Sequence, residues 1–223
     1  MTTVLVTKAW ARGAGLALTL AISALRSPAQ GIIHTVPAQP LYYGAVVNSQ
    51  DIDLNGDGSP DFRLLSDGTE VDLAPLANNA LVAVPEPPPD LGSFVAALNR
   101  GTPISSSLDP VLIWYAANTD PFGSALIVAC VNLGCLGNFQ NGTDAYAGVR
   151  LDAAGTFYYG WIHIQSFGLN FGQISEWAYE TGPNSPILAG AVPEPSTFLI
   201  LCFGVVLLIA RHRSSFSRTP QTD

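Results

Sequence analysis

Short runs of β-branched and aromatic residues recur along the middle of the chain, and each is bounded by Gly, Pro, Asn or Asp. Runs of this length and composition are typical of β-strands separated by turns. Their spacing predicts a mainly β fold, a single β-sandwich or jelly-roll-like domain. The expected strands are Leu41–Val47, Phe62–Leu65, Ala80–Val84, Val111–Ala116, Ala125–Cys130, Ala145–Leu151, Thr156–Gln165 and Ile174–Glu180.

Two local signals complete the expected domain. Asp90 can cap a short helix over Leu91–Asn99, and Gly101 follows where a helix commonly ends. The stretch from Asp152 to Gly155 lies between two expected strands and predicts a hairpin turn. We therefore expect one short helix in an otherwise β-rich body.

Acidic residues far outnumber basic ones between Gln30 and Val192. The basic residues there are Arg63, Arg100 and Arg150, against fifteen Asp and Glu, which gives a charge of about −12. This charge repels nucleic acid and anionic lipid and suits cations or neutral glycans, so no nucleic-acid partner is expected. A stretch of this length is one domain in size, and we expect residues 30–190 to form an extracytoplasmic body.

The N-terminus has the three parts of a secretory signal. Lys8 and Arg12 precede an apolar run over Ala14–Leu25, and small residues follow up to Ala29. We expect cleavage after Ala29, which makes residues 1–29 a signal peptide. The alternative is a membrane helix, but the run is well short of the roughly 20 residues needed to span a bilayer.

A second apolar run lies near the C-terminus. Thr197–Ala210 is uncharged and about 21 Å long as a helix, against a hydrocarbon core of about 30 Å. The basic tail, residues 211–218, carries Arg211, Arg213 and Arg218, which places the tail in the cytoplasm by the positive-inside rule. The pattern predicts a short transmembrane helix. Bilayer thinning and arginine snorkelling can compensate for the difference between its length and the thickness of the hydrocarbon core.

A proline motif stands directly before that run, formed by Val192, Pro193, Glu194 and Pro195. Residues 191–218 together resemble the PEP-CTERM sorting signal of Gram-negative bacteria that have exosortases. The resemblance implies that an exosortase, a multi-spanning transpeptidase-like membrane enzyme, recognises and cuts the chain near the motif. It further implies a transient inner-membrane anchor, and then release or transfer to the cell surface or the exopolysaccharide matrix.

Two other interpretations bear on this motif. An ordinary single-span anchor after a proline hinge is the alternative for the C-terminus. A second Val-Pro-Glu-Pro occurs at Val84–Pro87, but no apolar run follows it, so we interpret that copy as a proline-rich linker.

The sharpest chemical signal in the body is the sequence DIDLNGDGSPD, from Asp51 to Asp61. Oxygen donors at alternate positions, with glycine at the bend, are what a hard cation such as calcium requires. The loop resembles the Asp-rich calcium loops between β-strands of extracellular repeat proteins. The alternative is an acidic turn in which Asn-Gly and Asp-Gly serve a hairpin.

Two registers are open for this loop, one that begins at Asp51 and one that begins at Asp53. The second register uses more carboxylates, and neither has the glutamate that completes an EF-hand. The expected calcium ligands are Asp51, Asp53, Asn55, Asp57, Ser59 (through its carbonyl) and Asp61.

Three cysteines are present, and two of them, Cys130 and Cys135, bracket a short turn. In an exported chain this spacing predicts a local disulfide, and the alternative is a pair of buried thiols. Cys202 lies in the C-terminal apolar run.

Catalytic patterns are missing from the sequence. Glu176 and Glu180 share a face of an expected strand, but about 13 Å separates them, too far for a glycosidase pair. His163 is interpreted as a half-exposed strand residue. We therefore expect no enzyme, but a structural or glycan-binding role. The aromatic residues that could stack on sugars are Tyr42, Tyr43, Tyr158 and Trp161. The alternative is a secreted hydrolase acting on polysaccharide, with two carboxylates about 5 to 10 Å apart in a cleft.

Overall fold

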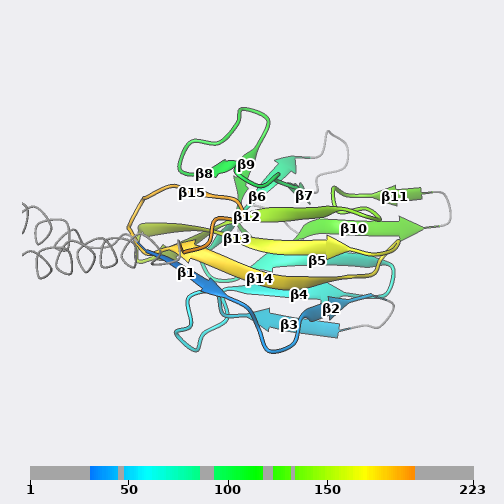
Figure 1. Ribbon diagram of the computed structural model, residues 1–223. Coiled ribbons are helices and arrows are strands. Elements are labelled where there is room, and N and C mark those ends of the chain that lie inside the picture. Colours follow the sequence, from blue (N-terminus) through cyan, green and yellow to red (C-terminus); the bar gives the residue numbers. More distant parts are fainter. Residues whose placement is uncertain (1–30, 45–47, 86–92, 118–122, 132–133, 194–223) are drawn as a thin grey trace, which may run out of the picture. The chain divides into compact units, whose positions relative to one another are not determined.

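The computed structural model describes residues 31–44, 48–85, 93–117, 123–131 and 134–193 (Figure 1). These residues form β-strands and connections, with no α-helix among them. The strands are β1 (Ile32–Thr35), β2 (Leu41–Tyr43), β3 (Asn48–Ile52), β4 (Phe62–Ser66), β5 (Glu70–Pro75), β6 (Ala80–Pro85), β7 (Ser93–Val95), β8 (Pro103–Ile104), β9 (Ile113–Tyr115), β10 (Ala125–Val131), β11 (Gly134–Leu136), β12 (Asp144–Ala153), β13 (Thr156–Ser166), β14 (Gly172–Glu180) and β15 (Ile187–Leu188).

One large sheet holds thirteen of these strands, in the order β1-β14-β13-β12-β6-β7-β10-β5-β4-β3. Beside this path, β11 pairs with β10, β2 with β14 and β9 with β6, while β8 and β15 form a small second sheet. The pairs are antiparallel except for β7 and β10. The β12–β13 hairpin turns at Ala154 and Gly155, whose φ angles of 53° and 86° fit a two-residue turn. The turn predicted at Asp152–Gly155 is thereby confirmed.

The large sheet curls into a half-barrel around its core. Leu73 of β5 and Ile127 of β10 belong to the same buried cluster as Ile162 and Ile164 of β13. The mainly β prediction is confirmed, but the sandwich is corrected. Because β6 and β7 carry hydrogen bonding without a break from β12 to β10, the two halves belong to one sheet.

The predicted helix at Leu91–Asn99 is wrong over the part that the structure describes. Ser93–Val95 form β7, and the backbone of Leu98 exchanges hydrogen bonds with Tyr146 of β12. Ser93 and Val95 are both buried, a two-residue period that fits a strand. Pairing with β6 and β12 outweighs the weak local preference for a helix.

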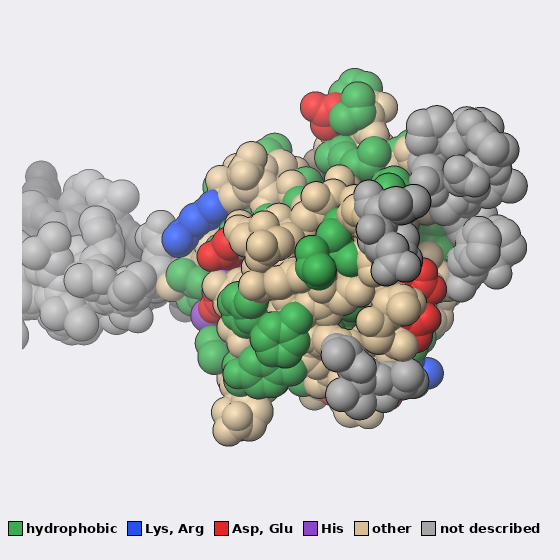
Figure 2. All heavy atoms as spheres, turned by 90° about the vertical axis from the view of Figure 1, so that its right-hand side faces the viewer, with side chains coloured by type: hydrophobic (Ala, Val, Ile, Leu, Met, Phe, Trp, Pro, Cys, Tyr) green, Lys and Arg blue, Asp and Glu red, His purple; other side chains and the backbone are tan. Residues whose placement is uncertain are grey.

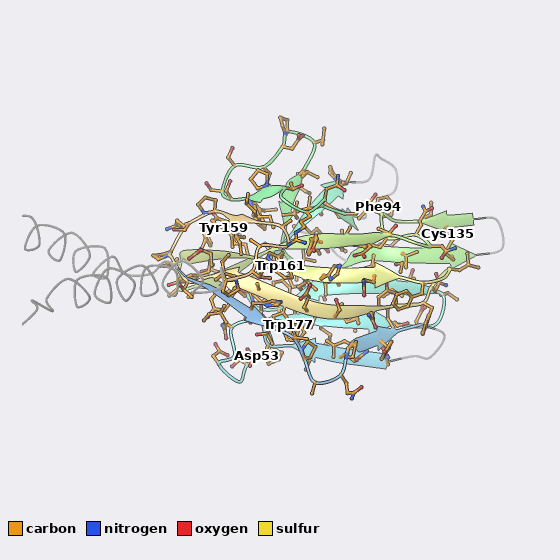
Figure 3. All side chains as sticks on the ribbon, in the orientation of Figure 1. Asp53, Phe94, Cys135, Tyr159, Trp161 and Trp177 are labelled. Carbon is orange, nitrogen blue, oxygen red and sulfur yellow. A yellow bond between two sulfur atoms is a disulfide. The ribbon has the colours of Figure 1, made fainter. Side chains whose placement is uncertain are left out.

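Strand β13 is covered on both faces. Ile162 and Ile164 face the inside of the curl, whereas Tyr159 and Trp161 lie on the opposite face, fully buried with Ile104 and Ile187. Figure 3 labels both aromatic residues on this strand. The segments that carry β8 and β15 therefore act as a cover over the outer face of the sheet.

Candidate functional site

The acidic loop between β3 and β4 is organised by the carboxylate of Asp53. Its Oδ1 accepts hydrogen bonds from the backbone N–H groups of Gly56 (2.7 Å) and Asp57 (3.2 Å), and its Oδ2 accepts one from Gly58 (2.8 Å). Gly56 and Gly58 have φ angles of 76° and 90°, which glycine adopts without strain. Asp53 (labelled in Figure 3) therefore forms the centre of the loop.

The other expected calcium ligands divide between the loop and its base. Asn55 Oδ1 accepts a hydrogen bond from Asp57 N, and Asp57 Oδ1 accepts one from Ser59 N, both at 2.8 Å. Asp51 stands outside this arrangement, because its carboxylate pairs with Arg63 across the hairpin at 2.6 Å. The hydrogen bond from Arg63 holds the pKa of Asp51 below its usual range.

Asp61 closes the base of the loop from a buried position. Its Oδ2 accepts hydrogen bonds from Leu54 N (2.9 Å) and Asn55 N (3.3 Å), and Asn79 Nδ2 donates to its Oδ1 (3.2 Å). Burial raises the pKa of Asp61 in spite of these bonds. Within the described residues, no group of three or more His, Cys, Asp or Glu is arranged to hold a metal ion. Calcium in this loop stays a prediction.

A groove of about 540 Å³ lies beside this loop. Its lining includes Asp57 and Asp61 of the loop, together with Asp152, Tyr158 and Tyr179. Tyr158, one of the aromatic residues expected to stack on sugars, therefore lines a concave surface next to carboxylates.

A second groove, of about 470 Å³, is lined by acidic residues that the sequence did not single out. Asp67, Glu70 and Asp72 lie in its wall, and Ser124 Oγ donates a hydrogen bond to Asp72 Oδ2 (3.2 Å). Burial, with a smaller contribution from the charge of Glu70, raises the pKa of Asp72 to about 6. The sequence does contain a signal for this groove. Glu70 and Asp72 are two positions apart in a β-rich run, so their side chains share a face if that run is a strand.

His163 belongs to a chain of polar side chains on the outer face of the sheet. Its Nε2 lies 2.5 Å from Asp144 Oδ1, its Nδ1 lies 3.3 Å from Glu176 Oε1, and Glu176 Oε2 lies 2.8 Å from His34 Nε2. A bulge in β14 also brings Ser175 Oγ to 2.9 Å from His163 Nδ1. These polar side chains link β1, β12, β13 and β14. The hydrogen bond between Asp144 and His163 holds the pKa of Asp144 below its usual range.

An exposed apolar patch occupies the connection between β13 and β14. Phe167, Leu169 and Phe171 are each about half exposed or more, and the ring of Phe171 is stacked with that of Tyr42 of β2 at 6.5 Å between centroids. The side chain of Asn170 donates hydrogen bonds to the carbonyls of Thr69 (2.8 Å) and Cys130 (3.3 Å). Figure 2 faces this end of the sheet and shows hydrophobic side chains gathered on it.

This patch changes the set of residues available to a sugar. Tyr42 is 49% exposed, but Tyr43 and Trp161 are buried in the core, so the stacking role expected for these two is wrong. Phe167 and Phe171 are the exposed aromatic residues beside Tyr42. The sequence signal was an aromatic-rich connection, Phe-Gly-Leu-Asn-Phe, between two long strands.

Cys130 and Cys135 face each other on the β10–β11 hairpin, and the structure joins them by a disulfide. The hairpin lies at the end of the sheet opposite to the Asp53 loop (Figure 3). Asn170 bonds to the Cys130 carbonyl, so the hairpin also supports the apolar patch.

The described part of the chain ends just inside the proline motif. Trp161 Nε1 donates a hydrogen bond to the Ala191 carbonyl (3.1 Å), which fixes the backbone on the outer face before Val192 and Pro193. Glu194, Pro195 and the tail arginines lie outside the described residues, as do the expected signal peptide and Cys202. In the described ranges no helix is long and apolar enough to cross a membrane, and the expected span at 197–210 falls beyond them.

Comparison with known families assigns the C-terminal segment. The family described as the PEP-CTERM protein-sorting motif matches residues 191–214. A motif of this kind implies an exported protein that is sorted to the cell surface. More specifically, this chain carries a PEP-CTERM sorting motif at its C-terminus, which implies that it is an exosortase substrate. The predicted recognition is confirmed. No curated protein and no solved structure matches the chain.

Proposed function

We propose that the protein is a non-catalytic component of the cell surface or exopolysaccharide matrix of a Gram-negative bacterium, where its body binds glycan. The sorting motif supports the destination, since it implies export and processing by an exosortase. The body supplies the binding surface, and a calcium ion in the Asp53 loop would stiffen it. The membrane is a transient partner in this proposal, before the exosortase acts.

The observation that carries the glycan-binding role is the apolar patch of Tyr42, Phe167, Leu169 and Phe171. Exposed aromatic rings are costly in water, and patches of them mark binding surfaces. Rings such as Tyr42 and Phe171, which lie 10° from parallel, offer flat apolar faces to the C–H faces of sugars. Gln173, opposite Tyr42 in the strand register, and Gln165 supply amide groups beside the rings.

The patch also lies at a suitable place. The orange segment that follows β15 and leads into the sorting motif lies on the left of Figure 1, whereas the β13–β14 connection lies on the right. The proposed binding surface is therefore at the end of the body away from the segment that leads into the sorting motif.

A binding experiment tests the patch. We expect the exported protein to be retarded in a native gel that contains exopolysaccharide from the host, and the Tyr42→Ala/Phe171→Ala variant to lose this retardation. Leu136→Ala, which removes another exposed apolar side chain, is the matched control. Equal retardation of all three proteins would contradict the proposed surface.

The sorting step has its own test. Glu194→Ala should leave export intact, because the signal peptide is unchanged, but it should trap the uncut form in the inner membrane. Deletion of the host exosortase should give the same result, and Glu86→Ala in the internal Val-Pro-Glu-Pro should have no effect. Wild-type protein that stays full length in a host with an active exosortase would favour the ordinary anchor.

A secreted hydrolase acting on polysaccharide is the second candidate function, and the Asp72 groove favours it. Asp72 and Glu70 are two positions apart on β5, which corresponds to about 7 Å along a strand. Glycosidases use carboxylate pairs about 5 to 10 Å apart, one of them an acid with a raised pKa. Asp72, with its pKa of about 6, would be that acid and Glu70 the base.

Release of reducing ends from the host polysaccharide tests this candidate. A hydrolase would lose activity in both Asp72→Asn and Glu70→Gln and keep it in Asp109→Asn, an acidic residue outside the groove. Absence of any release by the wild-type protein would leave the non-catalytic role.

A further inference from the structure

Arg150 of β12 is held between two aromatic rings on the outer face of the sheet. Its guanidinium carbon lies 5.0 Å from the centre of the Trp114 ring and 4.2 Å from that of Phe157. Tyr159 lies directly opposite Arg150 in the β12–β13 register, and its ring is 5.7 Å from that of Trp114. Four side chains from β9, β12 and β13 thus form one cluster, which we call the Arg150 cluster.

Three polar atoms of the Arg150 cluster are buried without a hydrogen-bond partner. They are Arg150 Nε, Trp114 Nε1 and the hydroxyl oxygen of Tyr159. Tyr159 is fully buried, so its hydroxyl has no access to bulk water. An unpaired buried donor costs roughly 1–3 kcal/mol, and three such atoms gather here on side chains that contact one another.

The charge of Arg150 makes the arrangement more unusual. Burial lowers the pKa of this guanidinium, and within the described residues no carboxylate lies within ion-pair distance of it. The body has three arginines and fifteen acidic residues, so its composition offers many carboxylates that could pair with an arginine. Arg150 is partly buried, and the cation–π contacts with the two rings return only part of the cost of removing water from its guanidinium.

We propose that the Arg150 cluster is a binding site for a single carboxylate carried by a sugar, a uronate residue in an otherwise neutral glycan. Arginine binds carboxylates through paired N–H donors. The Tyr159 hydroxyl and the Trp114 indole N–H are buried in the ligand-free protein, so they add two further donors only when the ligand opens the cluster. One carboxylate has lone pairs for all of these groups. The proposal rests on the proposed glycan-binding function and adds the ligand class and a second site.

The body charge of about −12 determines which uronate glycan fits. A polysaccharide with a carboxylate on every sugar would be repelled by the net negative charge of the body. A single carboxylate is attracted by the nearby positive charge of Arg150. Phe157 and Trp114 also surround the site with apolar surface, which suits the body of a sugar better than a small, fully hydrated anion.

The test compares methyl glucuronide with methyl glucoside, two sugars that differ only at the carboxylate. With the exported wild-type protein, we expect the glucuronide to raise the melting temperature and the glucoside to leave it unchanged. The glucuronide shift should be lost in Arg150→Gln and kept in Arg100→Gln, which alters an exposed arginine. Polygalacturonate, with a carboxylate on every sugar, should give a smaller shift per carboxylate at low salt.

Tyr159→Phe provides a variant that keeps the ring and removes only the unpaired hydroxyl. We expect it to be at least as stable as the wild type without ligand, and to show a smaller glucuronide shift. No shift with glucuronide in the wild type, or equal shifts with both sugars, would overturn the proposal. So would a loss of stability in ligand-free Tyr159→Phe, because that result would show that water already satisfies the hydroxyl.

Failure here is distinguishable from failure of the proposed function. Arg150→Gln should still be retarded by the host exopolysaccharide through the apolar patch, and the Tyr42→Ala/Phe171→Ala variant should still respond to glucuronide. Loss of both responses in either variant would show that the two surfaces are not separate, and would overturn the Arg150 site.

Discussion

Replacing Asp72 with asparagine should stabilise the protein at neutral pH. In the folded state burial raises the pKa of this carboxyl from 3.8 to about 6. Above pH 6 the folded protein must therefore hold a buried charge that the unfolded chain exposes to water. Asparagine has the same shape, carries no charge, and its carbonyl can still accept the hydrogen bond from Ser124.

The size of the effect follows from the two pKa values. A difference of about two pKa units corresponds to about 3 kcal/mol. Because Asp72 is only partly buried, solvent screening reduces the expected gain to about 1–3 kcal/mol. The sign follows from proton uptake. Between pH 3.8 and 6 the folded state binds more protons than the unfolded state, so wild-type stability falls as pH rises through this window.

Urea unfolding of the exported wild type and Asp72→Asn at several pH values measures this difference. The gain from the substitution should be complete above about pH 6 and should approach zero near pH 4. Contributions of all other groups cancel between the two proteins, because they share them. A gain that does not change with pH, or a loss of stability at pH 7.5, would refute the burial argument.

Asp67 provides a control of opposite sign on the adjacent turn. Hydrogen bonds from the backbone N–H groups of Glu70 and Thr69 hold the pKa of Asp67 below its usual value. Its ionised form therefore stabilises the fold above the unfolded pKa, and this contribution is lost as pH falls through the folded pKa. We expect Asp67→Asn to destabilise the protein at pH 7.5 and to have less effect in acid.

Three further predictions concern the acidic loop, the disulfide and the packing of β14. If Asp53, Asn55, Asp57 and Asp61 hold calcium, a chelator should lower the melting temperature, and Asp57→Ala should remove this response; no shift in either protein would contradict the metal. Mass spectrometry of exported protein without reduction should find Cys130 joined to Cys135 and Cys202 outside the bridge, and two alkylatable thiols in the body would show otherwise. Gly172→Ala should lower the stability by roughly 1–3 kcal/mol, seen as a lower urea midpoint, because the new Cβ would collide with the Gln165 carbonyl oxygen. Gly168→Ala, whose nearest contact is at 3.8 Å, should have little effect, and equal midpoints for the two variants would contradict this reasoning.

The sequence predicted those parts of the fold that depend on local order. The β12–β13 hairpin follows from two β-rich runs around Ala154 and Gly155, and both the strands and the turn are where they were expected. The helix at Leu91–Asn99 failed because two of the backbone partners of this segment, Leu126 of β10 and Tyr146 of β12, are remote in sequence. The curl of the sheet depends on the same kind of remote pairing.

The candidate sites divide in the same way. The Asp53 loop is made by residues within a few positions of one another, so its spacing was visible in the sequence. The Arg150 cluster needs Trp114 from β9 and Tyr159 from β13, and the raised pKa of Asp72 needs burial that only the folded sheet provides. Such sites have no spacing signature, because the contacts that define them join separate strands.

The pairing of β1 with β14 dictates when the body can finish folding. Strand β14 lies between β13 on one side and β1 and β2 on the other, and the contact between His34 and Glu176 joins residues 142 positions apart. In a chain that crosses the membrane N-terminus first, β1 and β2 cross early. They cannot pair with β14 until almost the whole body has crossed. Non-local pairing of this kind folds slowly. The strands β3, β4 and β5 pair with near neighbours in sequence, but the edge formed by β1 and β2 can be completed only after β14, close to the sorting motif, has crossed.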